Sequence, residues 1–302
     1  MDRTKGENMK ILQNALALIL ASIITLSLAA CGGKTSNSTE TQATVALETE
    51  TGAITTESIT LKVGASSTPH GELLELVKPI LAEEGINLEI VIYDDYVLPN
   101  TALQDGTIDA NYFQHRPYLN SFNKSNGTDL VTAGLVHYEP LGIYSFSIKD
   151  LKELPSGATI IVPDDDSNQT RAMFLLAQEG LVELPPDASV EKGVTILDIV
   201  DDHGYKIQAA QADTVPSLLK SSEEGTIAAI NYNYALGAGL KTTDAIAIED
   251  ASGDAAKTYA NIIAVRRGKE KDSAIVALVK ALQNGIVEKF NSNNGAGIVP
   301  IK

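Results

Sequence analysis

The chain of 302 residues contains one cysteine, Cys31, and no tryptophan. With a single thiol, an intramolecular disulfide is excluded whichever compartment the protein occupies. Basic residues are also scarce: 23 Lys and Arg stand against 39 Asp and Glu, which gives a formal net charge of −16. A surface of that sign repels the phosphates of DNA and RNA, so we expect no nucleic-acid binding.

The short motifs of common catalytic sites are missing as well. The sequence has no G-x-S-x-G elbow and no G-x-x-x-x-G-K-[ST] phosphate loop. Its four histidines form neither an H-E-x-x-H motif nor a close pair; they are His70, His115, His137 and His203. We therefore expect a protein that is not an enzyme and has no metal or cofactor. A zinc site assembled from these histidines and acidic residues stays open as an alternative.

One long apolar run is present, Ile11–Ala30, and it carries no charge. Basic residues precede it, and small residues lead from it into Cys31, which is the pattern of a secretory signal. A cysteine in this position resembles the lipobox of bacterial lipoproteins, which implies cleavage before Cys31 and a lipid on its thiol. Two alternatives stay open: an uncleaved membrane helix, since about 20 apolar residues span a bilayer, and an unmodified thiol.

The rest of the chain predicts a tether followed by a folded α/β protein. Residues 31–58 are rich in Thr, Ser, Glu and Ala and predict a disordered tether. From Ile59 onward, predicted strands alternate with predicted helices in two similar halves, which favours two lobes with a ligand cleft between them. We expect residues 59–138 and 240–302 to form lobe 1, and residues 139–239 to form lobe 2.

Three of the expected elements lie in the second half of the chain. The apolar residues of Ile196–Val200 predict a strand, and Asp272–Lys289 predicts one continuous helix. A third element, a helix, is expected to begin at Thr170, directly after a polar loop.

Aromatic residues are concentrated in one stretch of the first half. Tyr93–Phe122 holds six of them: Tyr93, Tyr96, Tyr112, Phe113, Tyr118 and Phe122. Several lie in loop-like sequence near His115, directly after a predicted strand, where a binding loop belongs. Aromatic walls suit an apolar or thioether side chain. Ordinary core packing is the alternative interpretation.

Two polar segments are candidates for binding a charged ligand. Asp164–Arg171 is a polar loop that ends at a helix start, where backbone N–H groups attract anions. Arg171 can hold a carboxylate through two parallel hydrogen bonds, or it can pair with a nearby Asp while the loop caps the helix. Asn231–Tyr234 follows a predicted strand, and an Asn amide can bind both the ammonium and the carboxylate of an amino acid.

Taken together, these segments resemble one known family. The matching residues run from Asp95 to Asn100, from Ile108 to Asn111, through Phe113-Gln114-His115 and Pro117-Tyr118-Leu119, and recur at Gly142–Ser145, Ala229–Asn231 and Asn261–Ile263. They resemble the methionine-binding lipoproteins of ABC importers, the MetQ/NlpA family. The resemblance implies a two-lobed periplasmic-binding-protein-like α/β fold. It also implies a monomer held at the cell membrane by a lipid on Cys31, on the extracytoplasmic side.

The resemblance also implies roles for eight side chains. Tyr96, Phe113, His115 and Tyr118 would enclose the methionine side chain, Arg171 would bind its carboxylate, and Asn168, Asn231 and Asn261 would hold the amino-acid head. The implied partners are L-methionine and an ABC permease with its ATPase subunits. D-methionine, a methionyl dipeptide, another apolar amino acid, or a metal remain as alternative ligands. One departure is Thr170, where the family typically has glycine before the arginine; we expect it to narrow the turn and shift Arg171.

Overall fold

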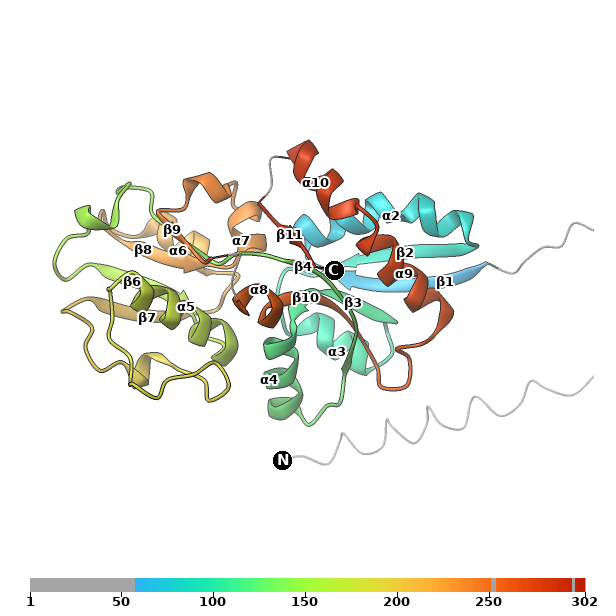
Figure 1. Cartoon of the computed structure of the whole chain (residues 1–302), viewed down its shortest axis with the longest axis horizontal. Helices are drawn as coiled ribbons and strands as arrows, with labels where there is room; N and C mark the ends of the chain where they lie inside the picture. The colour runs from blue at the N-terminus through green and yellow to red at the C-terminus, as the bar shows by residue number, and fades with distance from the viewer. Residues whose placement is uncertain (1–57, 251–253, 295–296, 302) are drawn as a thin grey trace, which may run out of the picture. The chain divides into compact units, whose positions relative to one another are not determined.

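The computed structural model describes residues 58–250, 254–294 and 297–301, which belong to one compact unit. The predicted signal peptide (residues 1–30), Cys31, and the predicted tether up to residue 57 lie outside the described residues. Two β-sheets organise the described chain, and each has helices packed on its faces (Figure 1). The two sheets form two lobes, which confirms the predicted fold class.

The first lobe contains a six-stranded sheet in the order β11-β4-β10-β3-β1-β2. Strands β1, β2 and β3 are parallel, whereas β10 and β11 run antiparallel to their neighbours. Their bounds are β1 Ile59–Ala65, β2 Ile86–Ile92, β3 Ala110–His115, β4 Val131–Tyr138, β10 Ala260–Val265 and β11 Val299–Pro300. The central strands β3 and β10 are buried at every position, because helices cover both faces of this sheet.

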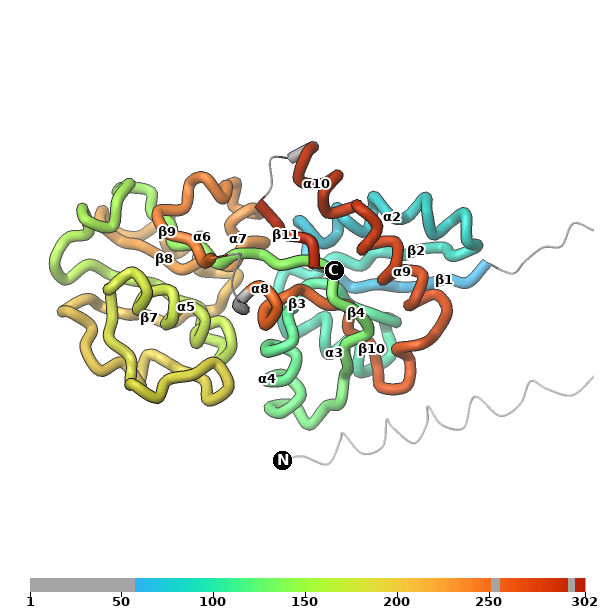
Figure 2. The backbone as a smooth tube through the Cα atoms, in the orientation of Figure 1, coloured from blue at the N-terminus to red at the C-terminus, as the bar shows by residue number. Residues whose placement is uncertain are grey.

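The second lobe contains a five-stranded sheet in the order β7-β6-β8-β5-β9. Strands β6, β7 and β8 are parallel, and β5 runs antiparallel to β8 and β9. Their bounds are β5 Gly142–Tyr144, β6 Thr159–Pro163, β7 Lys206–Ala210, β8 Ile227–Ile230 and β9 Ala247–Ile248. Figure 2 shows the chain leaving β4 and crossing from the first lobe to the second, and β5 follows three residues after β4.

The helices cover the sheets because their apolar side chains repeat at helical spacing. Leu73, Leu74, Val77 and Leu81 of α2 form such a stripe and are fully buried against the first sheet. Helices α9 and α10 pack on the same core, and α3 and α4 pack on the opposite face. Helices α5 and α6 cover the two faces of the second sheet.

The helix bounds are α2 Glu72–Glu83, α3 Leu98–Gln104, α4 Arg116–Asn126, α5 Asp166–Gln178, α6 Val215–Ser221, α7 Tyr232–Gly237, α8 Asp254–Thr258, α9 Ser273–Gln283 and α10 Ile286–Asn294. Short helical turns lie at η1 Ser67–Gly71, η2 Leu151–Glu153, η3 Ile196–Asp198 and η4 Thr242–Asp244. Within the described ranges, none of the helices combines the length and apolar character that a membrane span requires.

Three expectations about these elements are wrong. The expected strand at Ile196–Val200 is the turn η3, because Thr195 and Asp198 cap it reciprocally. The expected helix Asp272–Lys289 is two helices, since Gly285 adopts a left-handed φ of 76° between them. The expected return to lobe 1 at residue 240 is too early, because β9 at Ala247–Ile248 pairs with β5 in the second sheet.

Helix α5 also begins earlier than expected, at Asp166, with Asp165 as its N-cap. Thr170 therefore lies inside the helix and does not narrow a turn. Its hydroxyl donates to the Asp166 carbonyl oxygen over 2.7 Å and accepts from the Val194 N–H over 2.8 Å. Thr170 thus fastens a neighbouring loop to α5 while leaving the helical position of Arg171 undisturbed.

Candidate functional site

A pocket lies at the junction of the two lobes, with about 310 Å³ of space that protein atoms do not fill, part of it open to solvent. Strands β3 and β10 and the segment after β4 contribute to it from the first sheet. Helices α5 and α7 contribute from the other side. The lining residues are Tyr96, Phe113, Gln114, His115, Glu139, Asn168, Arg171, Asn231, Tyr232, Asn233 and Asn261.

Seven of the eight predicted site residues therefore line one pocket, and Tyr118 lies behind them. The Tyr118 ring centroid is 5.5 Å from that of Tyr96 and 6.1 Å from that of Phe113. Its hydroxyl donates to the Tyr96 carbonyl oxygen over 3.0 Å. Tyr118 supports the aromatic wall and is absent from its lining.

The aromatic wall is built on a rigid frame of amides and one carboxylate. Asp95 accepts the N–H groups of Val97 and Leu98 at the start of α3, which fixes the loop that carries Tyr96. The side chains of Asn100, Asn111 and Gln114 hydrogen-bond one another and join α3 to β3. Across the junction, the Tyr96 hydroxyl donates to Asn233 Oδ1 over 2.6 Å.

A chain of hydrogen bonds orients the polar side of the pocket. Asn168 Nδ2 donates to both carboxylate oxygens of Asp165, so Asn168 Oδ1 is the atom that faces His115 and Asn231. It accepts from His115 Nε2 over 3.0 Å and from Asn231 Nδ2 over 2.8 Å. Asn231 Oδ1 is then left buried and has no hydrogen-bond partner in the described part of the chain.

His115 is neutral in this arrangement. Its Nδ1 accepts the Tyr118 N–H over 3.2 Å, which leaves Nε2 as the protonated nitrogen that donates to Asn168. Burial, together with the nearby charge of Arg171, lowers the pKa of His115 to about 3. A neutral imidazole at this point adds a flat, partly apolar surface to the wall.

Arg171 is 4% exposed and is held by Glu249. Its Nε donates to both carboxylate oxygens of Glu249 over 2.7 and 2.8 Å, and Nη2 donates to Glu249 as well. The rings of Tyr138 and Tyr259 lie 5.4 and 4.8 Å from the guanidinium carbon. Burial opposes the charge, but the Glu249 carboxylate outweighs it and raises the pKa of Arg171.

Glu249 also joins the two chain segments that connect the lobes. One of its oxygens accepts the Tyr138 hydroxyl over 2.6 Å and the Leu141 N–H over 2.9 Å, on the segment from β4 to β5. Glu249 itself follows β9. Arg171 contributes a third link, because Nη2 donates to the Glu139 carbonyl oxygen. The guanidinium of Arg171, which lines the pocket, thus lies where the chain connects the two lobes.

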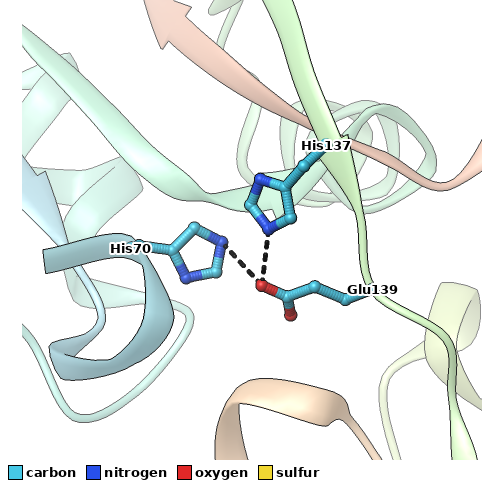
Figure 3. Close-up of side chains that lie close together, drawn as sticks. All are labelled: His70, His137 and Glu139. Carbon is cyan, nitrogen blue, oxygen red and sulfur yellow. Dashed lines mark hydrogen bonds and ion pairs between the residues drawn. The ribbon is translucent and has the colours of Figure 1, made fainter. Parts of the chain in front are cut away.

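Glu139 belongs to a buried group with two histidines, and Figure 3 shows both rings pointing at one of its oxygens. His137 Nε2 lies 2.8 Å and His70 Nε2 lies 3.4 Å from Glu139 Oε1. Burial lowers the pKa of His137 to about 3 and that of His70 to about 4, and it raises the pKa of Glu139.

These three side chains are the one group in the described ranges with enough close ligand atoms for a metal ion, since those atoms lie within 4.8 Å of one another. Hydroxyl groups already satisfy the outer nitrogens of both imidazoles: the Tyr112 hydroxyl lies 2.5 Å from His137 Nδ1, and Ser66 Oγ lies 2.7 Å from His70 Nδ1. The inner nitrogen of His137 donates to Glu139, whereas that of His70 donates to Asn261 Oδ1 over 3.0 Å and lies 3.4 Å from Glu139 Oε1. The group is therefore complete as a hydrogen-bonded network.

Sequence reasoning missed Gln114, Glu139, Tyr232 and Asn233 as lining residues and Glu249 as the partner of Arg171. Tyr232 and Asn233 lie in the candidate segment Asn231–Tyr234, and Gln114 is next to His115, so the positions of these three gave some signal. Glu249 gave none, since it lies 78 residues from Arg171.

An aromatic and polar pocket where two α/β lobes join is a common site for binding a small ligand. The family model described as NlpA lipoprotein matches residues 61–300, and the chain belongs to this family. Its members are solute-binding lipoproteins and not enzymes, which confirms the expectation that no catalysis occurs here.

Three relatives illustrate the similarity. The "methionine-binding lipoprotein MetQ" of Bacillus subtilis is 40% identical over 78% of this chain and 86% of its own. The structure of a nutrient-binding protein from Burkholderia cenocepacia, bound to methionine, is 39% identical and covers 80% of this chain and all of its own, with a TM-score of 0.75. A periplasmic substrate-binding protein of an ABC transporter from Coxiella burnetii is 35% identical, with the same coverage and a TM-score of 0.73.

Proposed function

We propose that this protein binds methionine outside the cytoplasmic membrane and delivers it to the permease of an ABC importer. One observation carries the proposal: an aromatic wall and a buried guanidinium face the same pocket. Tyr96 and Phe113 offer flat apolar surface to a thioether, and sulfur favours contact with aromatic rings. Arg171 offers a charge-assisted partner for a carboxylate.

The ligand's carboxylate would bind the guanidinium beside its existing partner. The hydrogen bonds of Arg171 described above use Nε and Nη2, so a carboxylate approaching from the pocket would engage Nη1. Asn168, Asn231 and Asn261 would surround the polar end of the ligand, in agreement with the resemblance.

The same proposal includes the anchorage of the protein. Cleavage before Cys31 would leave this residue at the N-terminus with a lipid on its thiol, and residues 31–58 would connect the lipid to β1. The protein would then act as a monomer at the extracytoplasmic surface, next to the permease and its ATPase subunits. The names of the relatives support this assignment.

The test is isothermal titration calorimetry of the purified lipoprotein in detergent, unfolded and refolded to remove any ligand carried through purification. We expect L-methionine to bind at one site per chain and to bind more tightly than leucine. D-methionine and methionyl dipeptides are titrated in parallel, since they are the nearest alternatives. The proposal would be contradicted if none of the methionyl compounds gave a heat of binding. It would also be contradicted if binding disappeared when metal ions were chelated.

A further inference from the structure

An exposed apolar turn lies on the second lobe, and none of its residues lines the ligand pocket. Leu197 is 90% exposed and Val200 is 64% exposed, and no other large apolar side chain in the described ranges is as exposed as either. Both border a groove that is also lined by Ile207 of the edge strand β7. Single exposed apolar residues are ordinary on a protein surface, whereas neighbouring ones beside a groove mark a contact surface.

The turn is held firmly in this exposed position. Thr195 Oγ1 accepts the Leu197 N–H over 3.2 Å, and the Asp198 carboxylate accepts the N–H and the hydroxyl of Thr195 over 2.8 and 2.9 Å. Ile196 and Ile199, on either side, pack against the core of the second lobe. The exposure of Leu197 is therefore a property of an anchored turn.

The chain around this turn is acidic. Residues 183–204 contain six Asp and Glu but only one Lys, and the ammonium group of that lysine lies 2.7 Å from the carboxylate of Asp187. Asp201 and Asp202 line the groove beside Val200, and none of the lining residues is cationic. Apolar side chains beside carboxylates are complementary to a protein surface that presents apolar side chains beside Lys and Arg.

The turn is also tied to the helix that reaches the pocket. The Ile196 N–H donates to Gln169 Oε1 over 3.2 Å, and the Val194 N–H donates to Thr170 Oγ1 over 2.8 Å. Gln169 and Thr170 lie in α5 directly before Arg171, which lines the pocket. A movement of α5 on ligand binding would therefore move the exposed turn as well.

We propose that Leu197, Val200, Asp201 and Asp202 form a docking surface for the permease, and that they bind a patch of its extracytoplasmic face where apolar side chains lie beside Lys or Arg. Two other occupants do not match the charges. A lipid surface would place the carboxylates against anionic headgroups, and a symmetric contact with a second copy of this chain would place them against each other. This inference rests on the proposed function and adds the surface through which the permease would recognise the protein.

The test separates docking from ligand binding by measuring both in each variant. Leu197→Ser removes the apolar contact. Asp201→Asn with Asp202→Asn removes two charges while keeping the side-chain oxygens that accept backbone N–H groups in the local turn. Each full-length lipoprotein replaces the wild type in the cells that produce it, and uptake of radiolabelled L-methionine is measured well below saturation. Calorimetry measures the affinity of each purified lipoprotein for L-methionine.

We expect both surface variants to lower uptake roughly 5- to 10-fold, because truncating a central contact of a protein interface weakens the complex by at least that order. Affinity for L-methionine should stay within about twofold of the wild type, since the altered residues lie outside the pocket. The matched controls are Leu218→Ser and the pair Glu223→Gln with Glu224→Gln. These change exposed residues on and after α6, which covers the other face of the same sheet, and they should transport methionine like the wild type.

A photocrosslink identifies the partner. With a lipid on Cys31, Leu197→Cys would introduce the only free thiol of the chain, and a benzophenone maleimide would label it. We expect the labelled lipoprotein to crosslink to an epitope-tagged permease subunit in membrane vesicles from the same cells. A crosslink to a second lipoprotein chain instead, or to lipid alone, would overturn the inference.

Normal uptake with either surface variant would overturn the inference and leave the proposed function intact. A loss of methionine affinity that accounts for the fall in uptake would overturn it too, since the turn would then act on the pocket and not on the permease. If deletion of the wild-type protein left methionine uptake unchanged, or if the wild type bound none of the methionyl compounds, the proposed function itself would fail and the inference with it.

Discussion

His115 and Asn168 meet across the junction of the lobes, with 3.0 Å between His115 Nε2 and Asn168 Oδ1. The first residue ends β3 and the second lies in the first turn of α5, so the bond joins the two lobes at the pocket itself. Because Asn168 Oδ1 also accepts from Asn231, this oxygen of α5 is hydrogen-bonded to two residues, one at the end of β3 and one directly after β8. The polar side of the pocket is therefore arranged before any ligand contact is made.

Replacing Arg171 by methionine should lower both the affinity for L-methionine and the free energy of unfolding. The substitution leaves the largely covered Glu249 carboxylate, whose side chain is 10% exposed, without its cation, and breaking a buried pair costs about 3–5 kcal/mol. In the double variant Arg171→Met with Glu249→Gln, urea unfolding should show most of that stability restored. Calorimetry should show that binding remains lost. Wild-type affinity in the double variant would remove Arg171 from the binding site.

The aromatic wall should distinguish sulfur from a methylene group. Norleucine has nearly the shape of methionine without its sulfur, and a sulfur–aromatic contact is worth about 0.3–1.5 kcal/mol. We expect wild-type protein to prefer L-methionine by roughly 2- to 12-fold, and Phe113→Leu to reduce this preference. Competition calorimetry measures the ratio in both proteins. A preference unchanged by Phe113→Leu would show that the ring does not touch the sulfur.

The stability of the fold should fall as the pH is lowered from 7 to 5. The folded pKa values of His70, His115 and His137 are about 4, 3 and 3, below the ordinary value of 6.5, so the unfolded chain binds more protons in this range. The contribution of these neutral histidines to the free energy of unfolding is fully present above pH 6.5. It is lost as the pH falls toward their folded pKa values, at a rate approaching about 1.4 kcal/mol per pH unit for each histidine. Glu139 opposes this trend: because its pKa is raised in the folded protein, protonation of Glu139 near that pKa favours the folded state as the pH falls.

Urea unfolding at several pH values measures this slope. His137→Gln should reduce it, because one buried group that must be neutral is removed. His203→Gln, at an exposed position, should leave it unchanged. A flat profile between pH 7 and 5 would mean that the buried histidines carry protons in the folded state.

Thr170→Val should destabilise the fold without affecting methionine binding. The substitution removes the hydroxyl that bonds the Asp166 carbonyl oxygen and the Val194 N–H, and a buried donor left without its acceptor costs about 1–3 kcal/mol. Thr101→Val is a matched control, since Thr101 makes the same kind of bond to a helical carbonyl oxygen at an exposed position. If Thr170→Val bound methionine more weakly under conditions in which the variant is fully folded, Thr170 would be shown to position Arg171.

Cys31→Ala should release the protein from membranes, because the variant has no thiol to which a lipid could be attached. Cell fractionation followed by immunoblotting measures the distribution, and calorimetry on the released protein should give unchanged affinity for L-methionine. Thr35→Ala, four residues further along, should stay with the membrane fraction. Persistent membrane association of Cys31→Ala would contradict the lipid anchor.

Local sequence patterns predicted most of the architecture. The apolar spacing in α2 and the all-apolar character of strands such as Ile227–Ile230 were sufficient to indicate an α/β protein. The pattern failed at Ile196–Val200, where a reciprocal cap decides the conformation. Ile196 and Ile199 pack against the core of the second lobe from a turn, whereas Leu197 between them is 90% exposed. The pattern failed again at Gly285, whose positive φ interrupts an otherwise continuous apolar stripe.

The candidate site was predictable where its residues belong to a local motif. The aromatic segment and the loop before Arg171 could be recognised because neighbours in sequence act together. That loop does cap the helix, through Asp165, four residues before the expected cap position. The partner of Arg171 could not be predicted, since an adjacent Asp was the obvious choice and the structure instead brings in Glu249. Ion pairs across long sequence separations depend on the tertiary fold, and nothing in the local pattern specifies them.

The contacts of Glu249 have a mechanical consequence. One carboxylate holds Tyr138 and Leu141 on one connecting segment, follows β9 on another, and grips Arg171 of α5. A rotation of one lobe against the other would bend these connecting segments, and both of them are tied to the Glu249 carboxylate or follow directly from it. Because Arg171 also lines the pocket, a ligand that binds the guanidinium would act on the residue that ties the connecting segments together.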